Sequence, residues 1–355
     1  MRSLIPLLCL LLSLATTSAQ LADKPLRSEA ELVDTLEQDN LQEAIRILLR
    51  SYIKRDNLDS LELNRAALQG LLDRSGFGIT LVDRRSEGED SGDPQQLVSE
   101  ALTDTVAYLR PGTYSDTELN AIGTRLAEFT SAGVKTLVLD LRARASDATF
   151  QGAAKFLDQF CPADELLFKI QKPGEASPSL FLSQSDTSWA GDLILLIDAQ
   201  TPPASEAVAT VLKRMRGPLL IGQRTPGETV EYEKVTIGTE AYLRFAVAEL
   251  VFADDSSLFR TGITPDLEIE MEISDKAYIF DASREQGMRP FIFSKRPPRL
   301  NEAALVAGTN PELDYAIALS AGRDTGYDSI PIHDRVVQAA LDYLVTADQL
   351  APASD

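Results

Sequence analysis

Cysteine and histidine are almost absent from this chain, which contains two cysteines and a single histidine. Cys9 lies in the apolar N-terminal run, so only Cys161 remains once that run is removed, and no intrachain disulfide can then form. A metal site with several histidine ligands is excluded, and a Ser-His-Asp arrangement would have to use His333. We expect His333 at a turn or helix start, and Cys161 as a packed apolar residue rather than a reactive thiol.

Positive charge is also scarce. The chain has 34 Lys and Arg against 54 Asp and Glu, which gives a formal net charge of -20. Such acidity argues against nucleic acid or an anionic membrane surface as a partner. The sequence indicates no cofactor and no metal, and a protein or peptide ligand is the partner class that it leaves open; it does not indicate the oligomeric state.

Apolar runs long enough to span a membrane are missing. The N-terminal run from Leu4 to Leu14 follows one basic residue, Arg2, and is followed by small residues ending at Ala19. This pattern predicts a secretory signal peptide over residues 1–19, cleaved after Ala19, because the run is too short to span a bilayer comfortably. We therefore expect a secreted or periplasmic protein that does not span the membrane after cleavage.

Residues 20–76 are predicted to form an N-terminal helical segment. Ser28 and Glu31 have the spacing of a capping box. Apolar residues then recur at helical spacing in two stretches, and we expect their leucines in the core: Leu41, Leu48 and Leu49 in the first, Leu61, Leu68, Leu71 and Leu72 in the second. Residues 77–104 are predicted to be an acidic linker or loop, because 84–96 read RRSEGEDSGDPQQ.

The stretch from Gly191 to Tyr232 has the clearest local pattern. Its order of apolar runs, helical spacing and Pro/Gly signals predicts strand, loop, helix, strand and turn. The predicted boundaries are a strand over 193–197, a loop over 198–204, a helix over 205–216 and a strand over 219–222. Unpaired backbone N–H groups gather where such a loop enters a helix, so chemistry is expected there.

This stretch resembles the active-site segment of the tail-specific, or C-terminal processing, serine proteases, which use a serine nucleophile and a lysine base. The corresponding text is DAQTPPASEAVA followed by IGQRTPGETVEY. Aligning the loop on Glu206 places Pro203 at the serine position. Aligning the turn on Thr225 and Gly227 places Glu228 at the lysine position and Tyr232 at the position of a following glutamine. Both catalytic positions are thus substituted.

Further motifs of the same family follow in the same order. Asp140-Leu141-Arg142 matches its Asp-Leu-Arg strand end, and Gly262 to Asp266 reproduces its Gly-Ile-x-Pro-Asp turn. The glycine pair that helps bind the oxyanion in active members falls on Ser146 and Asp147. A carboxylate there would repel the developing negative charge.

The resemblance covers about Thr105 to Met271 and implies an α/β fold: a crotonase-like spiral of strand-strand-helix units with helical segments at both ends. We expect the protease-like core over 105–272 and a C-terminal helical extension over 273–355. Many members of that family carry a peptide-binding PDZ domain in this part of the chain. The interval between Phe77 and Thr105 is too short to hold one.

Three functions remain open. The first is a catalytically inactive binding or scaffold protein. The second is a serine endopeptidase with a shifted pair, Ser205 and Lys234, although Ser205 also suits a helix N-cap and Lys234 a solvent-facing strand position. The third is a hydrolase that uses Glu228, Glu231 and Asp147 as acid and base.

Overall fold

The computed structural model describes residues 28–53, 59–75, 77–86, 96–142, 148–293, 302–323 and 332–350. The predicted signal peptide and the pair Ser146 and Asp147 lie outside these ranges. The chain divides into two compact units, Met1–Arg74 and Ser75–Asp355. Within the described ranges, no helix has the length and apolar character needed to cross a membrane.

The described part of the first unit is helical. Its helices are α1 (Glu29–Asp34), α2 (Gln38–Ser51) and α3 (Ser60–Ser75). The predicted capping box is confirmed, since the Ser28 side chain accepts from the Glu31 N–H and the Glu31 carboxylate accepts from the Ser28 N–H. The expectation that the leucines lie in a core is wrong: α2 has no buried residue, and Leu61, Leu68 and Leu71 are exposed. Three helices of this length offer too little surface to enclose both apolar faces.

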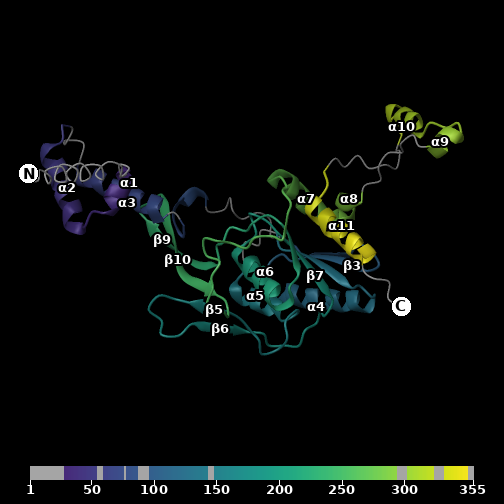
Figure 1. The fold of residues 1–355 in the computed structure, drawn as a ribbon, viewed down its shortest axis with the longest axis horizontal. Helices are drawn as coiled ribbons and strands as arrows, with labels where there is room; N and C mark the ends of the chain where they lie inside the picture. The colour runs from purple at the N-terminus through teal and green to yellow at the C-terminus, as the bar shows by residue number, and fades with distance from the viewer. Residues whose placement is uncertain are drawn as a thin grey trace, which may run out of the picture. The chain divides into compact units, whose positions relative to one another are not determined.

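A six-stranded sheet forms the centre of the second unit (Figure 1). Its strand order is β11-β8-β7-β4-β3-β2, and all neighbours are parallel except β2 and β3. The bounds are β2 (Val98–Ala101), β3 (Val106–Arg110), β4 (Thr136–Asp140), β7 (Asp192–Ile197), β8 (Leu219–Gly222) and β11 (Leu267–Glu268). The strands predicted from continuous apolar runs before Arg142 and in the central stretch are confirmed.

Alternate side chains of these strands point to opposite faces of the sheet and pack in two separate hydrophobic cores. One face packs against helices α4 (Asp116–Ser131), α5 (Phe150–Leu157) and α6 (Pro203–Arg216). The other packs against α7 (Ile273–Gln286), α8 (Arg289–Ile292) and α11 (Arg335–Leu350). Figure 1 shows the two groups of helices on either side of β3 and β7. Burial on both faces explains why the strands read as unbroken apolar runs.

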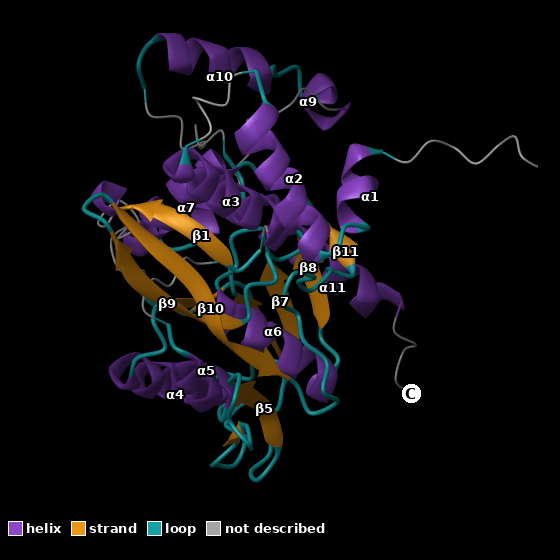
Figure 2. Ribbon diagram, turned by 90° about the vertical axis from the view of Figure 1, so that its left-hand side faces the viewer, coloured by secondary structure: helices purple, strands orange, loops and turns teal. Residues whose placement is uncertain are grey.

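A second, antiparallel sheet has the order β1-β10-β5-β6, with β9 pairing to β10 (Figure 2). Its strands are β1 (Ile79–Asp83), β5 (Leu166–Gln171), β6 (Ser179–Leu182), β9 (Val230–Ile237) and β10 (Ala241–Val251). The prediction of a linker over 77–104 is therefore corrected. Strand β1 lies in that interval and belongs to the antiparallel sheet, whereas β2 belongs to the six-stranded sheet. A short 3-10 helix, η2 (Arg84–Ser86), follows β1. Pairing with β10 and β3 holds these two short segments extended on either side of the charged stretch that suggested a linker.

The C-terminal segment is helical, as expected. Besides α7, α8 and α11 it contains α9 (Glu302–Val306) and α10 (Pro311–Ser320). The apolar face of α11, with Val336, Val337 and Ala340, is buried in the second core. The prediction of an α/β fold with helices at both ends is thus confirmed.

Candidate functional site

Helix α6 begins at the carboxyl edge of the parallel sheet, one loop after β7. Asp198 shapes this loop, since its N–H donates to the Thr201 hydroxyl at 2.8 Å and its carboxylate accepts from the Gln200 N–H at 2.9 Å. Pro202 is the N-cap and Pro203 the first helical residue. A proline suits this position because its missing N–H would have no partner within the helix. Pro203, which the sequence analysis aligned with a serine nucleophile, therefore carries neither a hydroxyl nor an N–H.

The Glu206 carboxylate joins this helix start to the turn that follows β8. It is fully buried and accepts hydrogen bonds from the backbone N–H groups of Gly227 at 2.6 Å and Glu228 at 2.8 Å, and from the Thr225 hydroxyl. Burial raises the pKa of this carboxyl, while the hydrogen bonds oppose the shift. The backbone at position 228 is thereby held beside the first turn of α6.

The turn itself is fixed by the Gly-Ile-Thr-Pro-Asp segment. Thr225 and Ile263 exchange two hydrogen bonds, from the Thr225 N–H to the Ile263 carbonyl and from the Ile263 N–H to the Thr225 hydroxyl. Gly262 has φ +62°, and a Cβ there would lie 2.1 Å from the Thr225 carbonyl oxygen. Only glycine fits such an approach, so Gly262 sets the backbone geometry of this turn.

The side chain of Glu228 lies near an arginine, which in turn stacks on a tyrosine ring. It is 38% exposed, and its Oε2 lies 3.9 Å from Nη2 of Arg244 on β10. The Arg244 guanidinium lies 3.4 Å from the centre of the Tyr232 ring. Burial first, and then the Glu228 charge, raise the pKa of Tyr232. The structure thus groups two of the family-matched positions, Glu228 and Tyr232, around an arginine that the sequence analysis did not identify.

Ser205 is not the N-cap, so that structural interpretation is wrong. The helix begins two residues earlier because the proline pair already has the backbone angle of an N-terminus. The Ser205 side chain is buried, and its hydroxyl lies 2.9 Å from the Tyr114 hydroxyl. Burial raises the pKa of Tyr114 well above its ordinary value, so this phenol stays protonated.

Tyr114 is held in the left-handed region, at φ +56°, by an acidic neighbour. The Glu118 carboxylate accepts from the backbone N–H groups of Gly112, Thr113 and Tyr114 at 2.6 to 2.7 Å. These bonds stabilise the unusual backbone that directs the tyrosine at Ser205.

Lys234 lies on the exposed part of β9, opposite Arg244, as the solvent-facing interpretation expected. Within the described residues, the Ser205 hydroxyl has Tyr114 as its side-chain partner and not Lys234. Of the three carboxylates suggested for acid and base work, Glu228 pairs with Arg244 and Glu231 with Lys172, while Asp147 is outside the described residues.

The Asp-Leu-Arg motif forms a buried ionic cluster. Arg142 is 1% exposed and donates to both Asp140 and Asp334, with Nη2 to oxygen distances of 2.7 and 2.8 Å. The Tyr108 hydroxyl donates to Asp140 at 2.7 Å. Burial raises the Asp140 pKa, but the charges of Arg142 and Arg110 and the hydrogen bonds from Arg142 and Tyr108 together outweigh it, so the pKa is lowered overall. This arrangement anchors the loop before α11 to the end of β4.

A cavity of about 530 Å³ lies beside this cluster, with Asp198, Gln223, Lys276 and His333 in its lining. Buried Lys276, also missed from the sequence, pairs with Asp198, and burial lowers its pKa against the effect of that carboxylate. His333 is half-buried just before α11, as expected of a helix-start residue. Cys161 is buried and its thiol pKa is raised to about 12 by burial, which confirms a packed rather than reactive cysteine. The described residues contain no group of three His, Cys, Asp or Glu side chains placed to hold a metal.

Three comparisons bear on this region. Residues 105–269 match the model of peptidase family S41. A carboxyl-terminal-processing protease from Synechocystis is 21% identical over 175 residues, which cover 49% of this chain and 40% of that protein. The chain thus spans well under half the length of this curated relative.

The chain was also compared with solved structures. A candidate peptidase from Parabacteroides merdae matches 72% of this chain and 90% of its own, at 14% identity and a TM-score of 0.50. A photosystem II D1 C-terminal processing protease matches 50% of this chain and 48% of its own, at 19% identity and a TM-score of 0.42. The first likeness supports the predicted fold for most of the chain.

Proposed function

Residues 105–269 form a peptidase S41-like domain, and from this premise we propose that the protein is a catalytically inactive relative that binds a protein or peptide ligand. The observation that carries the proposal is Pro203 as the first residue of α6. Proline has no group that can attack a carbonyl, and loss of a serine nucleophile lowers kcat by roughly a millionfold in a well-studied protease.

The position expected to carry the base supports the same conclusion. A serine–lysine mechanism needs a neutral amine that takes the serine proton. Glu228 offers a carboxylate instead, and its charge faces the Arg244 guanidinium. The backbone frame of the site is kept, because Glu206 still binds the N–H groups of Gly227 and Glu228. A site that has this backbone arrangement but neither a serine hydroxyl nor a lysine amine is better suited to binding a ligand than to cleaving it.

The alternative is a serine endopeptidase that uses Ser205 with Lys234. The observation in its favour is the position of Ser205, two residues from Pro203 in the same helical turn. Against it, the Ser205 hydroxyl is buried and bonded to a tyrosine whose raised pKa prevents it from acting as a base near neutral pH.

A cleavage assay separates the two. The mature protein, its Ser205→Ala variant and its Glu228→Gln variant are each incubated with an unstructured protein that ends in an apolar tail. We expect no cleavage by any of them while circular dichroism shows all three folded. Cleavage that is lost only in Ser205→Ala would establish the endopeptidase, and cleavage lost only in Glu228→Gln would establish a carboxylate enzyme.

A gain-of-function variant tests the frame directly. Pro203→Ser combined with Glu228→Lys restores both reactive groups on the retained backbone. Measurable cleavage by this double variant, and none by either single variant, would support descent of the site from a serine–lysine protease.

We propose further that the protein is secreted or periplasmic, with a leader over 1–19, a helical segment over 20–76, the protease-like core over 105–272 and a helical extension over 273–355. The N-terminal pattern MRSLIPLLCLLLSLATTSA supports the leader. N-terminal sequencing of the protein from a cell fractionation tests it: a mature chain that begins at Gln20 is expected, and an intact Met1 on cytoplasmic protein would refute it.

A further inference from the structure

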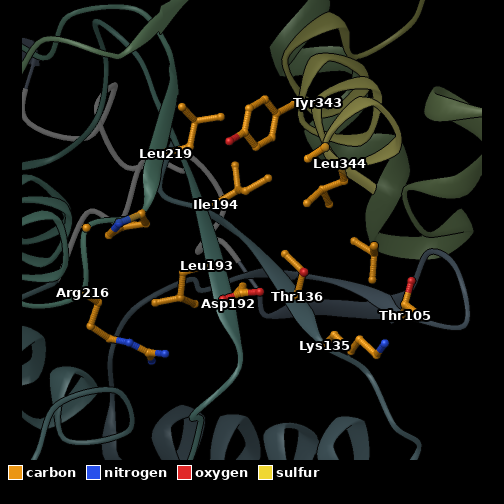
Figure 3. A pocket seen from close by; sticks show the side chains of 14 residues that line it. Thr105, Lys135, Thr136, Asp192, Leu193, Ile194, Arg216, Leu219, Tyr343 and Leu344 are labelled. Atoms are coloured by element: carbon orange, nitrogen blue, oxygen red, sulfur yellow. The ribbon is translucent and has the colours of Figure 1, made fainter. Parts of the chain in front are cut away.

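A cavity of about 410 Å³ opens at the edge of the parallel sheet opposite the candidate site (Figure 3). The candidate site lies beyond the carboxyl ends of β7 and β8, whereas this cavity lies at the amino ends of β3, β4, β7 and β8. The end of α6 and the outer part of α11 complete it. The lining consists of Thr105, Val106, Lys135, Thr136, Asp192, Leu193, Ile194, Arg216, Gly217, Pro218, Leu219, Tyr343, Leu344 and Ala347.

The size and the apolar part of the lining suit a small molecule. Ligand cavities in proteins usually measure about 300–1,000 Å³ and combine apolar walls with a few polar groups. Here Ile194 and Leu219 from the sheet and Leu344 from α11 supply apolar wall, with the Tyr343 ring beside them. A chain of methylene groups placed between them would be removed from water on several sides.

One end of the cavity is polar and lacks partners. Within the described residues, the side chains of Thr105, Lys135 and Thr136 have no hydrogen-bond or ion-pair partner. Thr136 is only 7% exposed, so its hydroxyl meets solvent chiefly through the cavity. A hydroxyl can both donate and accept, so the Thr136 hydroxyl in the cavity wall can bind a ligand oxygen.

The charge at this end favours an anion. Lys135 and Arg216 lie on either side of Asp192, the single acid of the lining, which leaves an excess of one positive charge in a chain of net charge -20. The Arg216 guanidinium is held in place because it donates to the carbonyls of Trp189 at 2.7 Å and Gly191 at 2.6 Å. Lys135 has no such partner, so its ammonium is the cation of this lining that remains for a carboxylate.

We propose that this cavity binds an anionic amphiphile: a carboxylate head at Thr136 and Lys135, and an unbranched apolar chain along Ile194, Leu219 and Leu344. This site is separate from the region around Pro203 and Glu228, and it goes beyond the proposed function because it holds whether or not that region cleaves peptides.

Sodium decanoate, kept below its micelle concentration, is the probe. Calorimetry on the full mature chain measures binding, and Trp189, the only tryptophan, reports it by fluorescence because its carbonyl contacts Arg216. We expect saturable one-to-one binding that Lys135→Glu weakens at least about tenfold and Thr136→Val about threefold or more. Lys155→Glu, at an exposed lysine paired with Asp116 on other helices, is the matched control and should bind like the wild type.

Three outcomes would overturn the proposal. The first is the absence of saturable heat from a folded protein. The second is equal affinity for decyltrimethylammonium, which has the same chain and the opposite charge, because the cavity would then select only apolar surface. The third is an unchanged affinity in Lys135→Glu, because the head would then lie elsewhere.

Discussion

The Glu206 carboxylate in the first turn of α6 lies 2.8 Å from the backbone nitrogen of Glu228, in the turn after β8. This contact links the start of α6, where Pro203 lies, to the turn at position 228 through the Glu206 side chain and a backbone N–H. The side chains at positions 203 and 228 take no part in it. The frame can therefore persist when the reactive side chains differ.

We expect Glu206→Gln to lower the free energy of unfolding by about 1–3 kcal/mol, since an amide keeps one acceptor oxygen and turns its NH₂ toward a buried N–H donor. Urea unfolding followed by circular dichroism measures the change. Glu233→Gln, on the exposed part of β9, is the matched control and should have little effect. Equal effects in the two variants would show that the Glu206 bonds are not important for stability.

The raised pKa of Glu206 also predicts a pH dependence. Its folded-state pKa lies above the ordinary value of 4.5, so the folded state binds more protons between the two values. The free energy of unfolding contributed by this group is therefore largest below pH 4.5 and decreases as the pH rises through the folded-state pKa. The stability difference between wild type and Glu206→Gln should shrink from pH 4 upward; a difference that grows would contradict the direction of the shift.

The Tyr114–Ser205 hydrogen bond is testable by a double-mutant cycle. Tyr114→Phe and Ser205→Ala each leave one buried hydroxyl without its partner, at a cost of about 1–2 kcal/mol. The double variant removes both hydroxyls, so its loss should fall short of the sum by roughly 1 kcal/mol. Strictly additive losses in urea unfolding would mean that the two hydroxyls do not interact in solution.

The buried ionic cluster predicts a large loss on truncation. Asp334→Ala leaves the Arg142 guanidinium with one of its two carboxylates, and we expect a loss of about 3–5 kcal/mol in the free energy of unfolding. Asp116→Ala breaks the exposed ion pair with Lys155 and should cost at most about 1 kcal/mol. Similar losses for the two variants would show that burial does not strengthen the Arg142 interactions.

Two glycines with nearly the same φ angle differ in the space available for a Cβ atom, so alanine substitutions at both separate the steric cost from the cost of the backbone angle. Gly217 has φ +64° with nothing near its missing Cβ, whereas Gly262 has φ +62° and the Thr225 carbonyl 2.1 Å away. Gly217→Ala should cost about 1–2 kcal/mol from the backbone angle alone. Gly262→Ala should cost clearly more, because the Thr225 turn must move. Thermal unfolding of both variants provides the comparison, and equal shifts in Tm would rule out a steric role for Gly262.

The sequence predicted best those elements whose residue pattern can be recognised without knowing which other elements they pack against. The strands ending at Asp140 and Ile197 are apolar throughout because both faces are covered, and the spacing of α6 is visible without knowing its partners. The Gly262 turn was recognised from its Gly-Ile-x-Pro-Asp motif, and the structure shows that its first position requires glycine. Each of these signals is local in the chain.

The contacts that escaped prediction join distant segments. Arg244 reaches Tyr232 only through the β9–β10 pairing, which contains an irregularity between Ala246 and Ala248. Tyr114 and Ser205 are 91 positions apart. Strands β1 and β2 are short and flank the charged stretch over 84–96. The composition of that stretch favoured a linker over the whole interval, and only the pairing with β10 and β3 identifies the two strands.

The distance along the chain between Arg142 and Asp334 also has a consequence for biosynthesis. The ribosome makes Arg142 192 positions before it makes Asp334, the second of its two carboxylate partners. Until then Asp140 alone pairs with the guanidinium, and its remaining N–H donors need water as partners. We therefore expect the sheet to begin to assemble during translation and its carboxyl edge to close only after Asp334 has left the ribosome.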